Sequence, residues 1–156
     1  MRVRFYLPIK PFSVNNMFYR DRRHKTQDYR DWEVAAIMAI NTPYVQQQLA
    51  KIRESFDENK HSFVVRFSFF YPPSVLLTKS GNVSSRAEDL TNVEKPLLDL
   101  LFLPKYHVQT PPYGAQNINT DDKHVVRLTS GKAISKDSKH YTHVSIAIVP
   151  KPTLAE

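Results

Sequence analysis

The chain has 156 residues, and its 22 Lys and Arg against 15 Asp and Glu give a formal net charge of +7. A hydrophobic content of 41% is enough for one packed domain, so the composition excludes a disordered tail and a disulfide miniprotein. Cysteine is absent and the three glycines stand apart, which excludes thiol catalysis, thiolate zinc sites and glycine-rich phosphate loops.

The first half of the chain predicts one strand and two helices. Apolar and polar residues alternate over residues 3–7, as in a half-buried strand, and prolines then end it. After a polar loop, Thr26 offers an N-cap to a helix that continues through Asn41. A capping residue followed by a proline then begins a second helix over residues 42–58.

The middle of the chain predicts a strand, a loop and a further helix. Strong alternation indicates a strand over residues 63–71, and a loop over residues 74–88 follows. The next helix is expected over about residues 92–103. Such a helix holds Pro96 in its first turn, where a missing N–H costs little.

An irregular stretch over residues 104–119 precedes two late strands. These are expected over residues 125–129 and 142–149, joined by a polar turn around Ser130-Gly131. The order β-α-β-α-β-β, with two to three helices, mixes strands and helices without strict alternation. We therefore expect a single α+β domain with a mixed β-sheet and helices on one face.

This domain is expected to cover residues 1–150, followed by a C-terminal tail over residues 151–156. No apolar run is long enough to span a bilayer, and the N-terminus has no apolar signal core. We therefore expect a cytoplasmic protein with no membrane partner.

The positive charge is concentrated near the N-terminus, where residues 1–30 carry eight Lys and Arg against two acids. Its densest part intersperses aromatic rings among cations: Phe18, Tyr19, Arg20, Arg22, Arg23, His24, Lys25, Tyr29 and Arg30. Cations among aromatic rings suit a phosphate backbone with bases or sugars beside it. A solvated surface loop would have the same composition, so both interpretations remain open here.

Acidic residues form two adjacent pairs, Glu88-Asp89 before a predicted helix and Asp121-Asp122 before a predicted strand. Neighbouring like charges in a basic protein are unfavourable unless a cation is bound between them. Mg²⁺ prefers hard oxygen ligands of this kind, with water and phosphate oxygens in the remaining positions. Simpler roles also fit, since Asp89 suits the positive end of a helix dipole and Asp121-Asp122 suits a turn.

Lys95 lies six residues after Asp89, on the predicted helix. An ammonium group near a metal site would stabilise negative charge that develops on a phosphate. A structural role is equally compatible with the spacing, because Lys95 and Asp99 stand four residues apart and could form an ion pair on the helix surface.

Three blocks of sequence occur in a recognisable order along the chain. They are Leu7-Pro8 with Pro11, Ser13, Asn15-Asn16 and Phe18-Tyr19-Arg20; Asp89-Leu90-Thr91-Asn92-Val93-Glu94-Lys95-Pro96-Leu97-Leu98-Asp99; and Asp121-Asp122 with Val125-Val126. Together these blocks resemble the RusA family of Holliday junction resolvases. The resemblance covers most of the chain.

In that family the aspartates bind Mg²⁺ or Mn²⁺, a lysine assists catalysis, and a homodimer resolves four-way DNA junctions by paired nicks. The resemblance implies that Asp89 and Asp122 are essential acids, that Asp121 is a further metal ligand, and that Lys95 is the catalytic lysine. It also implies a homodimer that acts on branched DNA in recombination and repair. The expected DNA-binding residues are Asn15, Asn16, Arg20, Arg22, Arg23 and Lys25.

The chain departs from the family pattern Asp-x-Asp-Asn at Thr91, which replaces the second acid. A neutral hydroxyl is a weaker ligand than a carboxylate, so metal affinity or preference could differ, or Glu88 could partly substitute. Asn92 and Asp99 match other recurrent positions, for which we expect a structural role. Two alternatives remain open: a catalytically silent domain that binds branched DNA, and a related nuclease that acts on flaps or other branched DNA.

Overall fold

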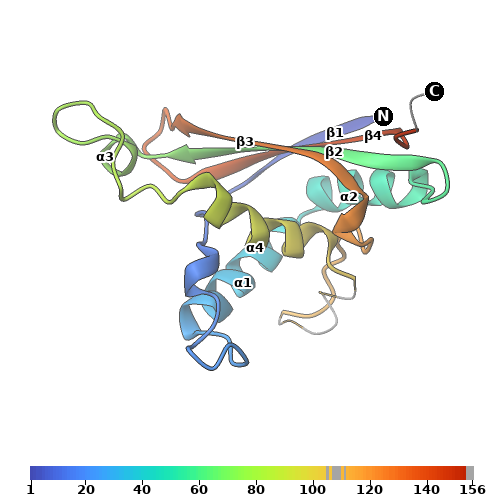
Figure 1. The fold of residues 1–156 in the computed structure, drawn as a ribbon, viewed down its shortest axis with the longest axis horizontal. Coiled ribbons are helices and arrows are strands. Elements are labelled where there is room, and N and C mark those ends of the chain that lie inside the picture. The colour runs from blue at the N-terminus through green and yellow to red at the C-terminus, as the bar shows by residue number, and fades with distance from the viewer. Residues whose placement is uncertain (105, 107–109, 111, 154–156) are drawn as a thin grey trace.

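One four-stranded sheet organises the fold (Figure 1). The computed structural model describes residues 1–104, 106, 110 and 112–153. Its strands are β1 (Arg2–Leu7), β2 (His61–Tyr71), β3 (Val125–Ile134) and β4 (Tyr141–Pro150), in the spatial order β1-β4-β2-β3. β2 and β3 are parallel and the other neighbouring pairs are antiparallel, which confirms the predicted mixed sheet of an α+β fold.

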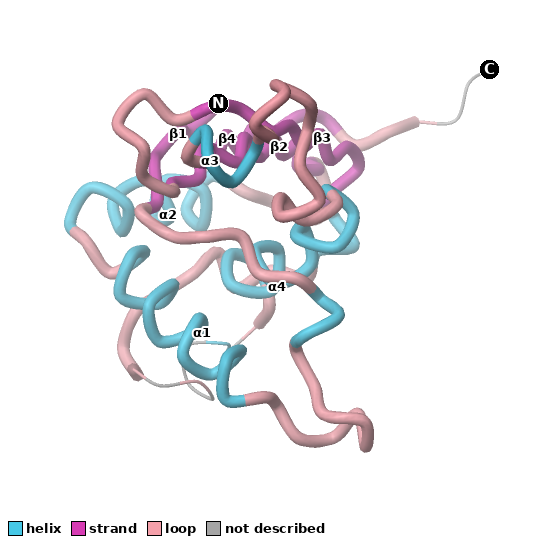
Figure 2. Tube along the Cα trace, turned by 90° about the vertical axis from the view of Figure 1, so that its left-hand side faces the viewer, coloured by secondary structure: helices cyan, strands magenta, loops and turns pink. Residues whose placement is uncertain are grey.

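The described residues also form helices and two short 3₁₀ turns. The elements are α1 (Gln27–Ile40), α2 (Pro43–Ser55), α3 (Pro73–Leu76), α4 (Leu90–Phe102), η1 (Val14–Asn16) and η2 (Asp122–His124). Figures 1 and 2 show that α1, α2 and α4 lie on the same side of the sheet. No helix in this described part of the chain is both long and apolar enough to cross a membrane.

Helix α3 corrects the predicted number and order of elements. It is a single turn of four residues within the stretch expected to be a loop, so the order becomes β-α-α-β-α-α-β-β. A single turn is too short to show the apolar periodicity that predicts a helix, and the prediction of two to three helices missed it for that reason.

The hydrophobic core lies on the face of the sheet that the helices cover. β2 alternates strictly, and its inward side chains Phe63, Val65, Phe67 and Phe69 are at most 1% exposed, whereas Arg66 on the other face is exposed. Each large apolar side chain that is fully buried contributes about 1.5–3 kcal/mol, so a row of four is a large part of the driving force.

The start of α1 is fixed by polar contacts that also hold the N-terminal segment in place. The Thr26 hydroxyl accepts a hydrogen bond from the Tyr29 amide at 3.1 Å, which confirms the predicted cap, and donates one to the Asn16 carbonyl at 2.6 Å. One turn later, Trp32 Nε1 donates to the Lys10 carbonyl at 2.7 Å. The segment between β1 and α1 is therefore anchored at both ends.

Helix α4 begins earlier than expected and places Pro96 in its interior. The first helical residue is Leu90, so Pro96 lies in the second turn rather than the first. A proline there removes the N–H that would bond to the Asn92 carbonyl. The Pro96 ring is buried, so tertiary packing compensates for the missing bond, and the capping residue is Asp89.

Strand β3 is twice as long as expected, and the predicted turn at Ser130-Gly131 is wrong. These residues lie inside the strand, where Gly131 pairs with Ser68 of β2 in parallel register. The chain turns instead over residues 135–140, between the ends of β3 and β4. The long partner β2 supplies backbone hydrogen bonds to a polar stretch that local sequence alone would assign to a loop.

Candidate functional site

The basic loop, residues 18–25, is a compact turn held by its own backbone. Phe18 and Lys25 form an antiparallel bridge, and the Tyr19 amide donates to the His24 carbonyl at 2.9 Å. The Asp21 carboxylate accepts hydrogen bonds from the His24 ring and from two backbone amides, and these contacts lower its pKa to about 2. The acid of this loop therefore organises the turn instead of neutralising its arginines.

The arginines of this region are free. Arg20, Arg22, Arg23 and Arg30 are exposed, and their guanidinium groups form no hydrogen bond or ion pair with any residue that the structure describes. Asn15 lines one hollow together with Arg20 and Arg22. Unpaired guanidinium groups present five donors each in a planar fork that matches phosphate oxygens.

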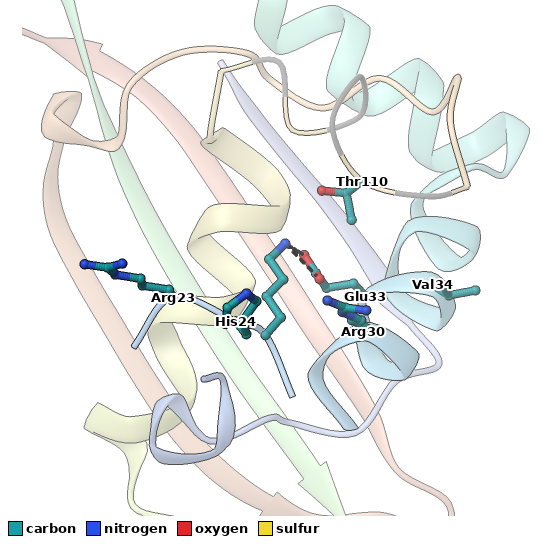
Figure 3. A pocket seen from close by; sticks show the side chains of 7 residues that line it. Arg23, His24, Arg30, Glu33, Val34 and Thr110 are labelled. Carbon is teal, nitrogen blue, oxygen red and sulfur yellow. Dashed lines mark hydrogen bonds and ion pairs between the residues drawn. The ribbon is translucent and has the colours of Figure 1, made fainter. Parts of the chain in front are cut away.

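Lys25, by contrast, is already occupied. Its Nζ lies 3.0 and 2.9 Å from the two carboxylate oxygens of Glu33, whose side chain is only 2% exposed. The Tyr106 hydroxyl donates a short hydrogen bond to the same carboxylate. Figure 3 shows Glu33 on α1, with Arg23, His24 and Arg30 around the pocket that these residues line.

Aromatic rings enclose the Lys25–Glu33 pair. Lys25 Nζ lies 5.3 Å from the ring centroid of Tyr29 and 5.8 Å from that of Tyr106. Burial is the main cause that raises the pKa of the Tyr29 and Tyr106 hydroxyls above their ordinary value, and the negative charge of Glu33 adds to it. Both tyrosines therefore stay neutral and can donate hydrogen bonds.

A second acid–lysine group lies on α4. Lys95 Nζ donates to Asp99 Oδ1 at 2.7 Å, which confirms the ion pair that their spacing allowed. Asp99 is buried, and burial raises its pKa; the contact with Lys95 opposes that shift, whereas the charges of Asp122 and Glu33 reinforce it. The Asp99 carboxyl therefore experiences charges from α1, α4 and η2.

The predicted metal ligands lie at two different ends of α4. Asp89 is the exposed N-cap of the helix and its side chain makes no capping hydrogen bond. At the other end, the Ile118 and Thr120 amides donate to carbonyls of the last helical turn, which places the following η2 beside that turn. Asp121 caps η2 by accepting from the Lys123 amide at 2.8 Å. A helix of 13 residues is about 20 Å long, so Asp89 is remote from Asp121-Asp122.

The carboxylates at the η2 end are the remaining candidates for a Mg²⁺ site. Among the residues that the structure describes, no group of three His, Asp or Glu could hold a metal ion. Mg²⁺ is, however, commonly held by one or two carboxylates with water and phosphate oxygens. The charge of Asp122 acts on Asp99, so these two carboxylates are the candidates for such a pair, and Thr91 stands on the Lys95–Asp99 face of α4 at helical spacing.

Sequence reasoning did not identify Glu33, and it gave Asp99 only a structural role. The signal for Glu33 is its position on the apolar stripe of α1, four residues after Tyr29 and four before Ile37. An acid at such a position is buried and needs a cationic or hydroxyl partner. The partners, Lys25 and Tyr106, come from distant parts of the chain, so spacing could not have identified them.

Comparison with protein-family models and with curated proteins gives no match for this chain.

Proposed function

We propose that this protein is a metal-dependent endonuclease that acts on branched DNA, with four-way junctions as the substrate that the RusA resemblance implies. The observation that carries the proposal is the group of free arginines on the basic loop, which the Lys25–Glu33 ion pair holds against α1. Lys25 of the loop pairs with Glu33, and Glu33 and Asp99 both act on the buried hydroxyl of Tyr29. The basic loop is thus joined to α1, and the charge of Asp99 on α4 reaches Tyr29 of the same helix.

The residues of this region have separate roles in the proposal. The free guanidinium groups of Arg20, Arg22, Arg23 and Arg30 bind DNA phosphates, an interaction that releases counterions and weakens as salt increases. Mg²⁺ or Mn²⁺ is held by Asp122, with Asp121 or Asp99 beside it. When bound, such an ion polarises a phosphodiester and lowers the pKa of an attacking water. In this proposal Lys95, whose side chain is 55% exposed, faces a phosphate on the side of α4 that carries Asp99.

A homodimer is part of the proposal because resolution of a four-way junction needs two nicks related by symmetry. A two-fold interface supplies two such sites in a fixed relation. Each site would then carry its own basic loop, and recognition would follow the branch geometry of the DNA more than its sequence.

A catalytically silent domain that binds branched DNA is the second candidate. Three observations favour it: Lys95 is engaged by Asp99, Asp89 is remote from Asp121-Asp122, and Thr91 is neutral. This candidate predicts the same affinity for branched DNA and no cleavage.

The deciding experiment incubates the purified protein in Mg²⁺ with labelled four-way junction, flap and linear duplex DNA. We expect nicks in the junction, a loss of nicking with Asp122→Asn and with chelator, and full activity in Asp137→Asn, which removes an exposed charge beyond the far end of β3 from Asp122. Binding without nicking would leave the silent domain as the function. Nicking of flaps in preference to junctions would change the substrate.

Two further variants test the residue assignments. Asp89→Asn decides whether the remote N-cap of α4 takes part, since equal nicking by wild type and variant removes Asp89 from the site. Lys95→Ala is expected to lower turnover more than junction affinity. If Lys95→Ala changes affinity alone, the lysine contacts the DNA backbone and does not assist the reaction.

A further inference from the structure

The open face of the sheet, opposite the helices, has an unusual charge composition. Its outward positions are occupied in four cross-strand rows: Arg2, Ala147, Val64 and Arg127; Arg4, Ser145, Arg66 and Thr129; Tyr6, His143, Ser68 and Gly131; Tyr141, Phe70 and Ala133. None of the four strands, all fully described, contains an Asp or Glu. The open face therefore carries arginine charge that no carboxylate of the strands offsets.

The four arginines of this face are exposed. Arg2 Nη1 donates to the Ser145 hydroxyl at 2.9 Å, and the guanidinium groups of Arg4, Arg66 and Arg127 have no hydrogen-bond or ion-pair partner in the described part of the chain. They occupy two adjacent rows of the sheet, and rows of side chains on one face are about 7 Å apart. This arrangement is a strip of cations across the width of the sheet.

An aromatic strip lies directly beside the cationic strip. Tyr6 of β1 is 62% exposed, and its ring centroid lies 4.6 Å from His143 and 5.7 Å from Tyr141. Tyr141 in turn stacks on Phe70 of β2 with centroids 4.4 Å apart. The rings therefore form one continuous cluster over three strands, with Tyr6 as its most exposed member.

A shallow hollow continues the face toward β3. It is lined by Arg66, Ser68, Thr129 and Gly131 among others, and a side chain added at Gly131 would meet no atom within 4 Å. Gly131 adopts ordinary strand geometry, so its missing side chain is not required by the backbone. Its effect is to leave room above the sheet beside Arg66.

We propose that the open face of the sheet binds single-stranded DNA, with unpaired bases stacked on Tyr6 and its neighbouring rings and phosphates bound by Arg4, Arg66 and Arg127. Stacking on exposed rings needs bases whose faces are free, which a duplex does not offer. The arginine strip binds the backbone that accompanies those bases. This activity requires neither a metal nor cleavage, so it goes beyond the proposed nuclease function.

Charge disfavours the other obvious occupant, a second copy of the chain. A two-fold pairing of open faces would bring two sets of four arginines together, and no carboxylate of the strands would compensate them. A polyanion removes this repulsion, whereas an identical basic face increases it.

The test measures the affinity of labelled single-stranded and duplex DNA by fluorescence anisotropy in chelator. The full-length chain carries Arg20→Gln, Arg22→Gln, Arg23→Gln and Arg30→Gln, so that the free arginines of the basic loop and of α1 do not contribute. We expect Tyr6→Ala to weaken single-strand binding about tenfold and Tyr6→Phe to preserve it, because the ring and not the hydroxyl stacks. We expect Arg66→Gln to reduce the slope of log affinity against log salt by about 0.7.

Two control variants and a measurement of the molecular mass in solution, which reports the oligomeric state, make the outcome decisive. Tyr113→Ala and Lys51→Gln remove an exposed ring and an exposed cation away from the sheet, and both should leave affinity unchanged. Tyr6 and Arg66 are exposed, so their variants should keep the wild-type melting temperature. Equal affinity of Tyr6→Ala and wild type, or preference for duplex, would overturn the proposal. A shift from dimer to monomer on Arg66→Gln would show that a second copy occupies the face.

Discussion

The pair formed by Lys25 and Glu33 allows a quantitative test of the structure. The Glu33 side chain is 2% exposed and that of Lys25 is 34% exposed, so the two partners have unequal access to water. Replacement of Lys25 by methionine leaves a buried carboxylate without its cation, a change that costs about 3–5 kcal/mol when both partners are buried. Because Lys25 is partly exposed, we expect the lower value, about 3 kcal/mol.

The converse change should cost less. In Glu33→Gln the amide oxygen can still accept from Tyr106, and the Lys25 ammonium group can turn toward water. We expect a loss of about 1 kcal/mol, within the usual range for an exposed partner. The double variant removes the uncompensated charge and should be more stable than Lys25→Met alone, with a coupling of about 2 kcal/mol.

Urea unfolding of the wild type, the two single variants and the double variant measures this cycle. For a chain of this length, 3 kcal/mol also corresponds to a fall of about 6–12 °C in melting temperature. If Lys25→Met costs less than Glu33→Gln, or if the two losses simply add, Lys25 does not neutralise a buried Glu33.

Three further predictions concern the helices. Burial raises the pKa of Asp99 above 3.8, so the folded chain binds the carboxyl proton more tightly than the unfolded chain does. The contribution of Asp99 to the free energy of unfolding therefore falls as pH rises through the raised pKa. Asp99→Asn should therefore gain stability relative to wild type as pH rises above 3.8, and urea midpoints of the two proteins that stay parallel as pH rises would contradict this. Pro96→Ala restores a helical N–H and should raise the melting temperature by about 2–4 °C, net of lost ring packing; a decrease would show that the packing dominates. Thr26→Ala should destabilise by about 1–2 kcal/mol and Thr26→Ser by much less, and equal losses would mean that the hydroxyl does not cap α1.

The sequence predicted correctly those elements that are determined by residues close together along the chain. Alternation over β2 was visible because one face of the strand is buried and the other is not. Thr26 and Pro43 marked the starts of α1 and α2 because capping and a fixed proline φ act within one turn. These features depend on neighbours close in sequence, so the chain displays them directly.

The features that sequence did not predict depend on partners far along the chain. β3 extends through Gly131 because β2 pairs with it, and Pro96 is tolerated inside α4 because tertiary contacts bury its ring. The same holds for the site: Glu33 is stabilised by Lys25 and Tyr106, and Asp99 is influenced by Asp122. Only packing brings these groups together, so a motif could suggest acids in this region but not their mutual arrangement.

The two proposed DNA surfaces lie on opposite sides of the molecule. In Figure 1 the basic loop projects from the helical side, whereas the open face of the sheet is turned away from it. A straight duplex cannot contact both, but a branched DNA with an unpaired segment can. We therefore expect Arg22→Gln in the loop and Tyr6→Ala on the sheet to weaken binding of such a DNA by independent amounts, so that their free-energy losses add in the double variant. On linear duplex only Arg22→Gln should have an effect. If Tyr6→Ala lowers duplex affinity equally, the two surfaces do not discriminate branched DNA in this way.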